Sequence, residues 1–184
     1  FWISSAVAVG AALFAVAAHA QALPPTNPDQ VPQLRPGVVA GYMPREGLVD
    51  SLALLPPPPT GGSEELAADD AARRSVTTLR ESARWKLAFR DSDYSSPKAV
   101  EAFACTLGVA ITQTDTPHLY MLLRRSLVDA GLATYKAKIH YNRTRPFVAA
   151  NDNTICSPLE EAALRKDGSY PSGHSAIGWA WGLV

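Results

Sequence analysis

Cysteine and surplus charge are both scarce in this sequence. Its 184 residues include only two cysteines, Cys105 and Cys156, and neither sits in the spacing of a zinc site or a catalytic motif. Lysine and arginine together number 17, as do aspartate and glutamate, so the formal net charge is zero. No overall field therefore attracts nucleic acid or an acidic membrane surface. Any function of the basic residues has to be local.

Long apolar runs are also rare. Residues 2–18 form one, rich in alanine, followed by Ala18-His19-Ala20 and Gln21. Such a run with small residues at its end is typical of a secretory signal peptide, and it is shorter than the roughly 20 residues of a membrane span. We predict a signal peptide over residues 1–20 and a mature protein in the periplasm or secreted, with a membrane anchor as the alternative.

Both ends of the chain lack the usual signals. Phe1 is not a methionine, and Val184 lies inside an apolar run without a helix stop signal. We therefore expect the chain to be a fragment of a longer protein. In an oxidising compartment Cys105 and Cys156 could pair with each other, or one could pair with a cysteine elsewhere in that protein. The sequence leaves both open.

Alternating strand patterns and internal repeats are absent, which predicts an all-α fold. Residues 21–62 are rich in proline, including Pro56 to Pro59, and should form an extended arm on the surface of a helical domain at 63–184. The arm should bury its apolar side chains, which are Val38, Val39, Tyr42, Leu48, Leu52, Leu54 and Leu55. Capping residues and apolar spacing predict helices at about 63–90, 96–107, 116–131 and 132–141, and another beginning near 175.

Positive charge is concentrated before the last predicted helix. No acidic residue occurs between positions 129 and 152, and this stretch holds Lys136, Lys138, Arg143 and Arg145. Pro146 disfavours helical backbone at Arg145, so this side chain should lie past the helix end and turn back toward Lys138. An arginine can bind two phosphate oxygens, whereas a lysine supplies a point charge. Solvated surface cations are the alternative.

A turn at Tyr170-Pro171-Ser172-Gly173-His174 precedes the apolar segment 176–184. The N–H groups at a helix N-terminus lack intrahelical partners and attract anions. Ser172 can donate its hydroxyl, and Gly173 lets a ligand approach the backbone closely. A histidine can give a proton to a leaving oxygen, so His174 is a candidate general acid. A packed, hydrogen-bonded histidine is the alternative.

The two stretches together resemble a known signature. Lys138, six residues, Arg145-Pro146 and then Pro171-Ser172-Gly173-His174 are similar to the first two motifs of the type 2 phosphatidic acid phosphatase superfamily. That superfamily includes bacterial non-specific acid phosphatases, lipid phosphate phosphatases and vanadium haloperoxidases. The segments 50–59, Arg84-Trp85 and 116–120 look like the soluble, exported class A acid phosphatases.

The resemblance implies a helical bundle of the acid phosphatase and vanadium haloperoxidase type. It also implies hydrolysis of small-molecule phosphate monoesters through a phosphohistidine, without a metal or other cofactor. Lys138, Arg145, Ser172 and Gly173 would bind phosphate, and His174 would be the general acid. The nucleophilic histidine belongs to a third motif, Ser-Arg followed by His and Asp, which is expected beyond Val184, so this chain alone should be inactive.

Further expectations concern partners. Phosphate or vanadate should inhibit. We expect no nucleic-acid partner, because the basic cluster is short and the net charge is zero, and no membrane attachment after signal cleavage, because no other segment could span a bilayer. The alternatives are a vanadium-dependent haloperoxidase-like protein and a non-catalytic exported module that binds phosphate or another anion. The preferred substrate, transfer of phosphate to alcohols and assembly into a homo-oligomer stay open.

Overall fold

A computed structural model describes residues 22–94 and 98–184. The predicted signal peptide and the predicted helix start at Ser96-Pro97 lie outside these ranges. The described chain is mainly helical, which confirms the predicted all-α class. Its helices are α1 (Ser51–Leu54), α2 (Glu64–Thr77), α3 (Ala83–Ser92), α4 (Lys98–Glu101), α5 (Ala104–Leu107), α6 (Pro117–Ala133), α7 (Tyr135–Tyr141), α8 (Pro146–Ala149), α9 (Glu161–Leu164) and α10 (Gly173–Leu183). Within the described residues no helix is long and apolar enough to cross a membrane.

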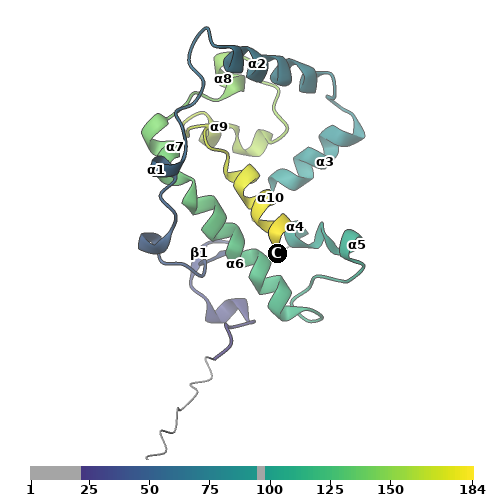
Figure 1. Cartoon of the computed structure of the whole chain (residues 1–184). Coiled ribbons are helices and arrows are strands. Elements are labelled where there is room, and N and C mark those ends of the chain that lie inside the picture. The colour runs from purple at the N-terminus through teal and green to yellow at the C-terminus, as the bar shows by residue number, and fades with distance from the viewer. Residues whose placement is uncertain (1–21, 95–97) are drawn as a thin grey trace, which may run out of the picture.

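Helix α6 is the centre of the fold, and α10 packs along it (Figure 1). Pro117 occupies the first turn of α6, where its missing N–H costs no hydrogen bond. A hydrogen bond joins α10 to α6: the Nε1–H of Trp181 donates to the Leu123 carbonyl oxygen at 2.9 Å. Ile177 of α10 is buried against Leu127 and Val128 of α6. This packing fixes where the N-terminus of α10 lies.

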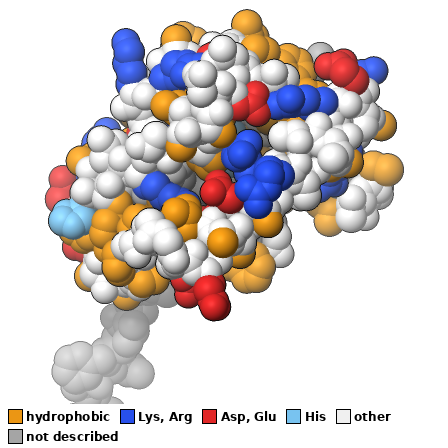
Figure 2. All heavy atoms as spheres, turned by 90° about the horizontal axis from the view of Figure 1, so that it is seen from above, with side chains coloured by type: hydrophobic (Ala, Val, Ile, Leu, Met, Phe, Trp, Pro, Cys, Tyr) orange, Lys and Arg blue, Asp and Glu red, His pale blue; other side chains and the backbone are white. Residues whose placement is uncertain are grey.

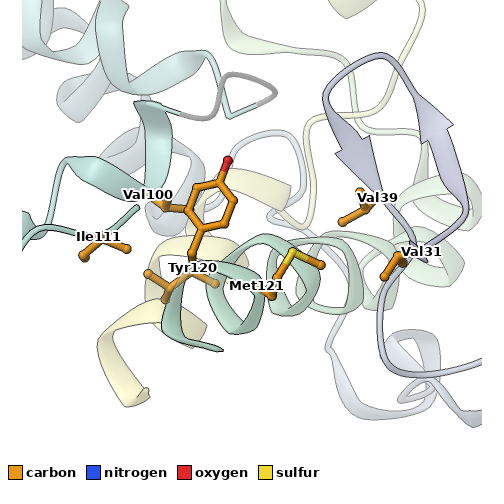
Figure 3. Close-up of a cluster of buried hydrophobic side chains, with 7 residues drawn as sticks. Val31, Val39, Val100, Ile111, Tyr120 and Met121 are labelled. Carbon is orange, nitrogen blue, oxygen red and sulfur yellow. The ribbon is translucent and has the colours of Figure 1, made fainter. Parts of the chain in front are cut away.

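A second buried cluster joins three distant parts of the chain (Figure 3). Tyr120, Met121 and Leu123 supply it from α6, and Met121 is 1% exposed. Val100 and Ile111 come from the segment before α6, and Val31 and Val39 come from the N-terminal arm. Burial of side chains of this size contributes about 1.5–3 kcal/mol each to stability. The cluster therefore holds the arm and the helices together.

The N-terminal arm is more structured than the sequence suggested. The two short strands β1 (Gln33–Arg35) and β2 (Val38–Val39) pair antiparallel, and 3₁₀ turns lie at Pro28–Gln30 and Arg45–Gly47. The prediction of no strand was wrong here, because the left-handed Gly37 (φ 77°) allows a tight turn between the two short strands. A third 3₁₀ turn, Pro158–Glu160, precedes α9.

Polar contacts also attach the arm to α6, and only some of the arm's apolar side chains are buried. The Asp129 carboxylate accepts from the N–H groups of Tyr42 at 2.9 Å and Met43 at 3.2 Å. The Arg125 guanidinium donates to the carbonyl oxygens of residues 40 and 41 at 3.1 and 2.6 Å and lies 3.9 Å over the Tyr42 ring. Val39 is buried as predicted, but Leu54 is 70% exposed. The predicted burial of every apolar arm residue was therefore wrong.

The long helix predicted at 63–90 is two helices in the structure. Ser63 caps α2 as predicted, accepting from the Leu66 N–H at 3.2 Å. The helix stops at Thr77, and Glu81 adopts left-handed backbone with φ 62°. Ser82 then caps α3 by accepting from the Trp85 N–H at 3.2 Å. A second cap offers the backbone an alternative to continuing the first helix, and apolar spacing alone did not reveal it.

Candidate functional site

The loop 167–172 lies directly against the segment 138–145. The Ser169 N–H donates to the Arg143 carbonyl oxygen at 2.8 Å, and the Ser169 hydroxyl donates to the same oxygen at 3.1 Å. Gly168 sits so close to α7 that a Cβ there would lie 2.9 Å from the Lys138 carbonyl oxygen. Tyr170 and Pro171 are joined by a cis peptide bond. The close docking of this loop brings the two sequence motifs together.

Lys138 is a buried cation at this junction. It lies in the last turn of α7 and is 4% exposed. Its ammonium donates to the carbonyl oxygens of Pro171 at 2.6 Å and Gly168 at 3.2 Å. Burial lowers the pKa of Lys138, an effect opposed by the charge of Asp167 and reinforced by that of Arg145. Since an ammonium has three N–H donors, these two contacts leave one donor without a partner among the described residues.

Arg145 reaches the same loop from the other side. Its backbone is extended (φ −68°, ψ 142°) before Pro146, as predicted. Its Nε–H donates to the Asp167 carbonyl oxygen at 3.0 Å, and Nη2 donates to the Asp167 carboxylate at 3.0 Å. The guanidinium makes no hydrogen bond through Nη1 to the described residues. This amino group is free to meet an anion.

Asp167 is the site residue that the sequence reasoning did not identify. Its carboxylate neutralises part of the charge of Arg145 and fixes the guanidinium plane. The sequence feature that could have pointed to Asp167 is its position beside Gly168, directly before the turn 170–174. An acidic residue next to a basic cluster is common, however, and its partner lies 22 residues away in sequence.

The N-terminus of α10 presents unpaired backbone donors. Ser172 is the N-cap, and its hydroxyl oxygen accepts from the Ser175 N–H at 3.2 Å. The first helical bond runs from the Ala176 N–H to the Ser172 carbonyl oxygen at 3.2 Å, so the N–H groups of Gly173 and His174 have no partner within the helix. The Ser172 hydroxyl hydrogen is also available to donate. A Cβ added to Gly173 would meet no atom within 4 Å, so this helix start is open to a ligand.

His174 is exposed and held by the end of α3. Its Nε2 lies 3.0 Å from the Ser92 carbonyl oxygen. A carbonyl oxygen only accepts, so Nε2 carries a proton and Nδ1 is the nitrogen left for another partner. The imidazole packs edge-on against the Tyr94 ring, with 4.9 Å between centroids, and the guanidinium of Arg35 lies 5.3 Å from the same Tyr94 ring.

The other candidate residues lie apart from this arrangement. Lys136 is exposed and forms an ion pair with Asp50 at 2.8 Å. Cys105 and Cys156 are both free thiols in the structure. The predicted phosphate-binding residues are thus gathered around the loop 167–172, whereas the other two predicted cations, Lys136 and Arg143, both form ion pairs.

A surface cavity of about 210 Å³ opens beside Arg145 and Asp167. Its remaining walls come from residues 142–144, Val148, Arg165 and Lys166. Seen from above, basic side chains gather beside acidic ones on the face where α2 and α8 lie (Figures 1 and 2). In the two described ranges, no three His, Cys, Asp or Glu side chains are grouped as for a metal ion. Cationic side chains outnumber acidic ones in the walls of this cavity.

Several curated proteins are similar in sequence to this chain. A non-specific acid phosphatase from Providencia stuartii is 39% identical over 144 residues, 78% of this chain and 58% of that protein. The chain is thus similar to a non-specific acid phosphatase over most of its own length. Another non-specific acid phosphatase, from Salmonella typhimurium, is 44% identical over 107 residues, 58% of this chain and 42% of that protein. An acid phosphatase from Zymomonas mobilis is 40% identical over 110 residues, 60% of this chain and 41% of that protein.

The chain matches only part of those proteins. The alignments span about half the length of the curated relatives, from 41% to 58%. No family model matches the chain. The relationship therefore rests on the curated sequences, and the activity of the whole protein is a matter for proposal.

Proposed function

We propose that the protein containing this chain is an acid phosphatase that hydrolyses phosphate monoesters. The observation that carries the proposal is the convergence of Lys138, Arg145 and the N-terminus of α10 on one loop. Two fixed cations and unpaired helix N–H groups are the donors that a phosphate dianion requires. The names of the curated relatives support the same activity.

In the proposed reaction, the phosphate oxygens are held by four groups of this chain. Lys138 offers its remaining N–H, Arg145 offers Nη1, Ser172 offers its hydroxyl, and Gly173 offers its backbone N–H. Charge stabilisation of this kind carries most of the catalysis in phosphoryl transfer. Asp167 keeps the Arg145 guanidinium in place without occupying all of its donors.

The covalent step needs a nucleophile that we assign to the third motif, beyond Val184. There a histidine nitrogen attacks phosphorus, and the bond from phosphorus to the ester oxygen breaks. His174 protonates the departing alkoxide. Because Nε2 donates to the Ser92 carbonyl oxygen, the proton transferred is the one on Nδ1 of the imidazolium. Water then attacks the phosphohistidine and releases phosphate.

We further propose that the protein is exported, with residues 1–20 as its signal peptide, and that this chain alone is inactive. Export follows from the sequence pattern at 2–20, and inactivity follows from the assignment of the nucleophile to a later motif. The positive charge in the proposed reaction comes from the side chains of Lys138 and Arg145. Activity should therefore survive treatment with EDTA.

The deciding experiment compares the 184-residue chain with a clone extended to the natural stop codon of its gene. Both are assayed with p-nitrophenyl phosphate at mildly acidic pH, with and without EDTA, and both are titrated with vanadate by calorimetry. The proposal requires hydrolysis by the extended form alone, unaffected by EDTA. If neither form hydrolyses the ester while vanadate still binds, the protein is an anion-binding module rather than an enzyme.

A further inference from the structure

The imidazole of His174, the proposed general acid, is exposed and has one hydrogen-bond partner among the described residues. Its Nε2 lies 3.0 Å from the Ser92 carbonyl oxygen, which also accepts from the Tyr94 N–H at 3.2 Å. A single hydrogen bond fixes one atom of a ring but leaves the ring plane free to turn. Another contact is therefore needed to hold Nδ1 in one direction.

The ring of Tyr94 supplies such a contact. It meets the His174 imidazole edge-on, with 4.9 Å between centroids and 71° between the planes. This arrangement is favourable because the positive edge of one ring faces the negative face of the other. Tyr94 also packs against the buried cluster of Val38, Leu127, Val128 and Ile177. Because buried side chains are closely packed, the Tyr94 ring is a firm support for the imidazole.

Arg35 of the N-terminal arm contacts the same tyrosine. Its guanidinium lies 5.3 Å from the centre of the Tyr94 ring, a cation–π arrangement. The hairpin that carries Arg35 is anchored to α6, because the Arg124 guanidinium donates to the Gly37 carbonyl oxygen at 2.9 Å. Val38, the next residue of the hairpin, is buried. The arm thus reaches the general acid through one aromatic ring.

Tyr135 of α7 connects this arginine–tyrosine pair to the proposed phosphate site. Burial raises the pKa of the Tyr135 phenol, and the charge of Asp167 raises it further. The other groups whose charges act on this phenol are Tyr94, Arg35 and Arg145. One phenol therefore has both pairs as neighbours, the arginine–tyrosine pair from the arm and α3 side and the Arg145–Asp167 pair from the phosphate side. The support of the general acid lies close to the phosphate-binding groups.

We propose that Tyr94 and Arg35 are positioning residues for the general acid. Tyr94 holds the imidazole of His174 so that Nδ1 faces the leaving oxygen, and Arg35 holds the Tyr94 ring. The inference rests on the proposed function and adds to it residues that touch neither the phosphate nor the reacting atoms. A well-placed general acid contributes about 10²–10⁴-fold to the rate, and a misplacement of about 1 Å can cost about 10²-fold. Loss of the support should therefore slow only esters whose leaving group needs a proton.

The test uses the extended protein with ethyl phosphate and p-nitrophenyl phosphate as substrates. Tyr94→Leu keeps an apolar side chain against the buried cluster but removes the ring. Its kcat for ethyl phosphate should fall about 10- to 100-fold, with KM within about twofold, because Tyr94 supports the acid and does not bind phosphate. Hydrolysis of p-nitrophenyl phosphate should change by less than about twofold, since nitrophenolate leaves without a proton. Tyr94→Phe keeps the ring and should restore both rates.

Arg35→Met tests the same role without a change in the buried cluster, because Arg35 is exposed. Its kcat for ethyl phosphate should fall about two- to fivefold, the size of an exposed cation–π contact. Since Arg35 acts through the ring, Arg35→Met should cause no further loss when it is added to Tyr94→Leu. The matched control Arg45→Met removes another exposed arginine of the arm and should alter neither substrate.

The outcomes separate this inference from the proposed function. If the unaltered extended protein does not hydrolyse p-nitrophenyl phosphate, the proposed function is wrong and the positioning role is overturned with it. If His174→Ala selectively slows ethyl phosphate but Tyr94→Leu slows neither substrate, or both equally, only the positioning role is overturned. Equal losses in Tyr94→Phe and Tyr94→Leu would also overturn it, because the hydroxyl rather than the ring would then be responsible.

Discussion

Replacing Lys138 with methionine tests the centre of the proposed site. Methionine has a similar length and suits a buried position, so the change removes the charge with little change of volume. Lys138 is 4% exposed, and its ammonium donates to the Pro171 and Gly168 carbonyl oxygens. One N–H remains for a phosphate oxygen. A charge-assisted hydrogen bond of about 1.5–3 kcal/mol corresponds to roughly 10- to 150-fold in affinity.

The assay is inhibition of p-nitrophenyl phosphate hydrolysis by vanadate in the extended protein. Lys138→Met should raise the inhibition constant by that factor. The control Lys136→Met, two residues away on the same helix, removes an exposed lysine paired with Asp50 and should change the constant by less than about twofold. An inhibition constant for Lys138→Met within twofold of the unaltered protein, with a normal unfolding curve, would place Lys138 outside the site and refute the reasoning.

The pH dependence gives a second check on Lys138. Burial lowers its pKa from the usual 10.5. The ammonium that binds vanadate is therefore lost at a lower pH than in an exposed lysine, and affinity should fall as pH rises through the lowered pKa. The effect of pH on folding stability has the opposite sign to its effect on vanadate affinity. The unfolded chain holds this proton more tightly, so the contribution of Lys138 to stability rises with pH between the lowered pKa and 10.5. Both effects should be absent in Lys138→Met.

Three other predictions use single variants of the extended protein. His174→Ala should slow alkyl phosphates by about 10²–10⁴-fold and p-nitrophenyl phosphate much less, because nitrophenolate leaves without a proton; equal losses would contradict the general-acid role. Gly168→Ala places a Cβ 2.9 Å from a backbone oxygen of α7, so thermal unfolding should show a loss of about 1–3 kcal/mol, whereas Gly61→Ala, with open space around it, should be neutral. The pKa of Asp50 is lowered by the hydrogen bond from Lys136 and then by backbone N–H groups. The stabilising effect of the Asp50 carboxylate is therefore present above its usual pKa of 3.8 and is lost as pH falls through the lowered value. Asp50→Asn should thus lower the melting temperature at pH 6, and the difference from the unaltered protein should disappear in acid.

Local signals in the sequence predicted several helix boundaries correctly. Ser63 caps α2, Gly108 ends α5 with φ 65°, and Pro117 begins α6. Each depends on one or two residues and their own backbone, so no tertiary information was needed. The break between α2 and α3 was missed because the apolar spacing continues through it. The positive φ of Glu81 and the cap at Ser82 are visible only in the folded chain.

The sequence by itself determined which groups are available to the site. The spacing of Lys138 and Arg145, the extended backbone before Pro146 and the Ser172 cap are properties of short segments, and steric restriction or local hydrogen bonding imposes them. The tertiary structure alone decided how these groups are paired. Docking of Gly168 against α7 buries Lys138 and lowers its pKa. The fold also brings His174 to a carbonyl oxygen 82 residues away in sequence, because tertiary packing, rather than any local preference, places α3 beside the start of α10.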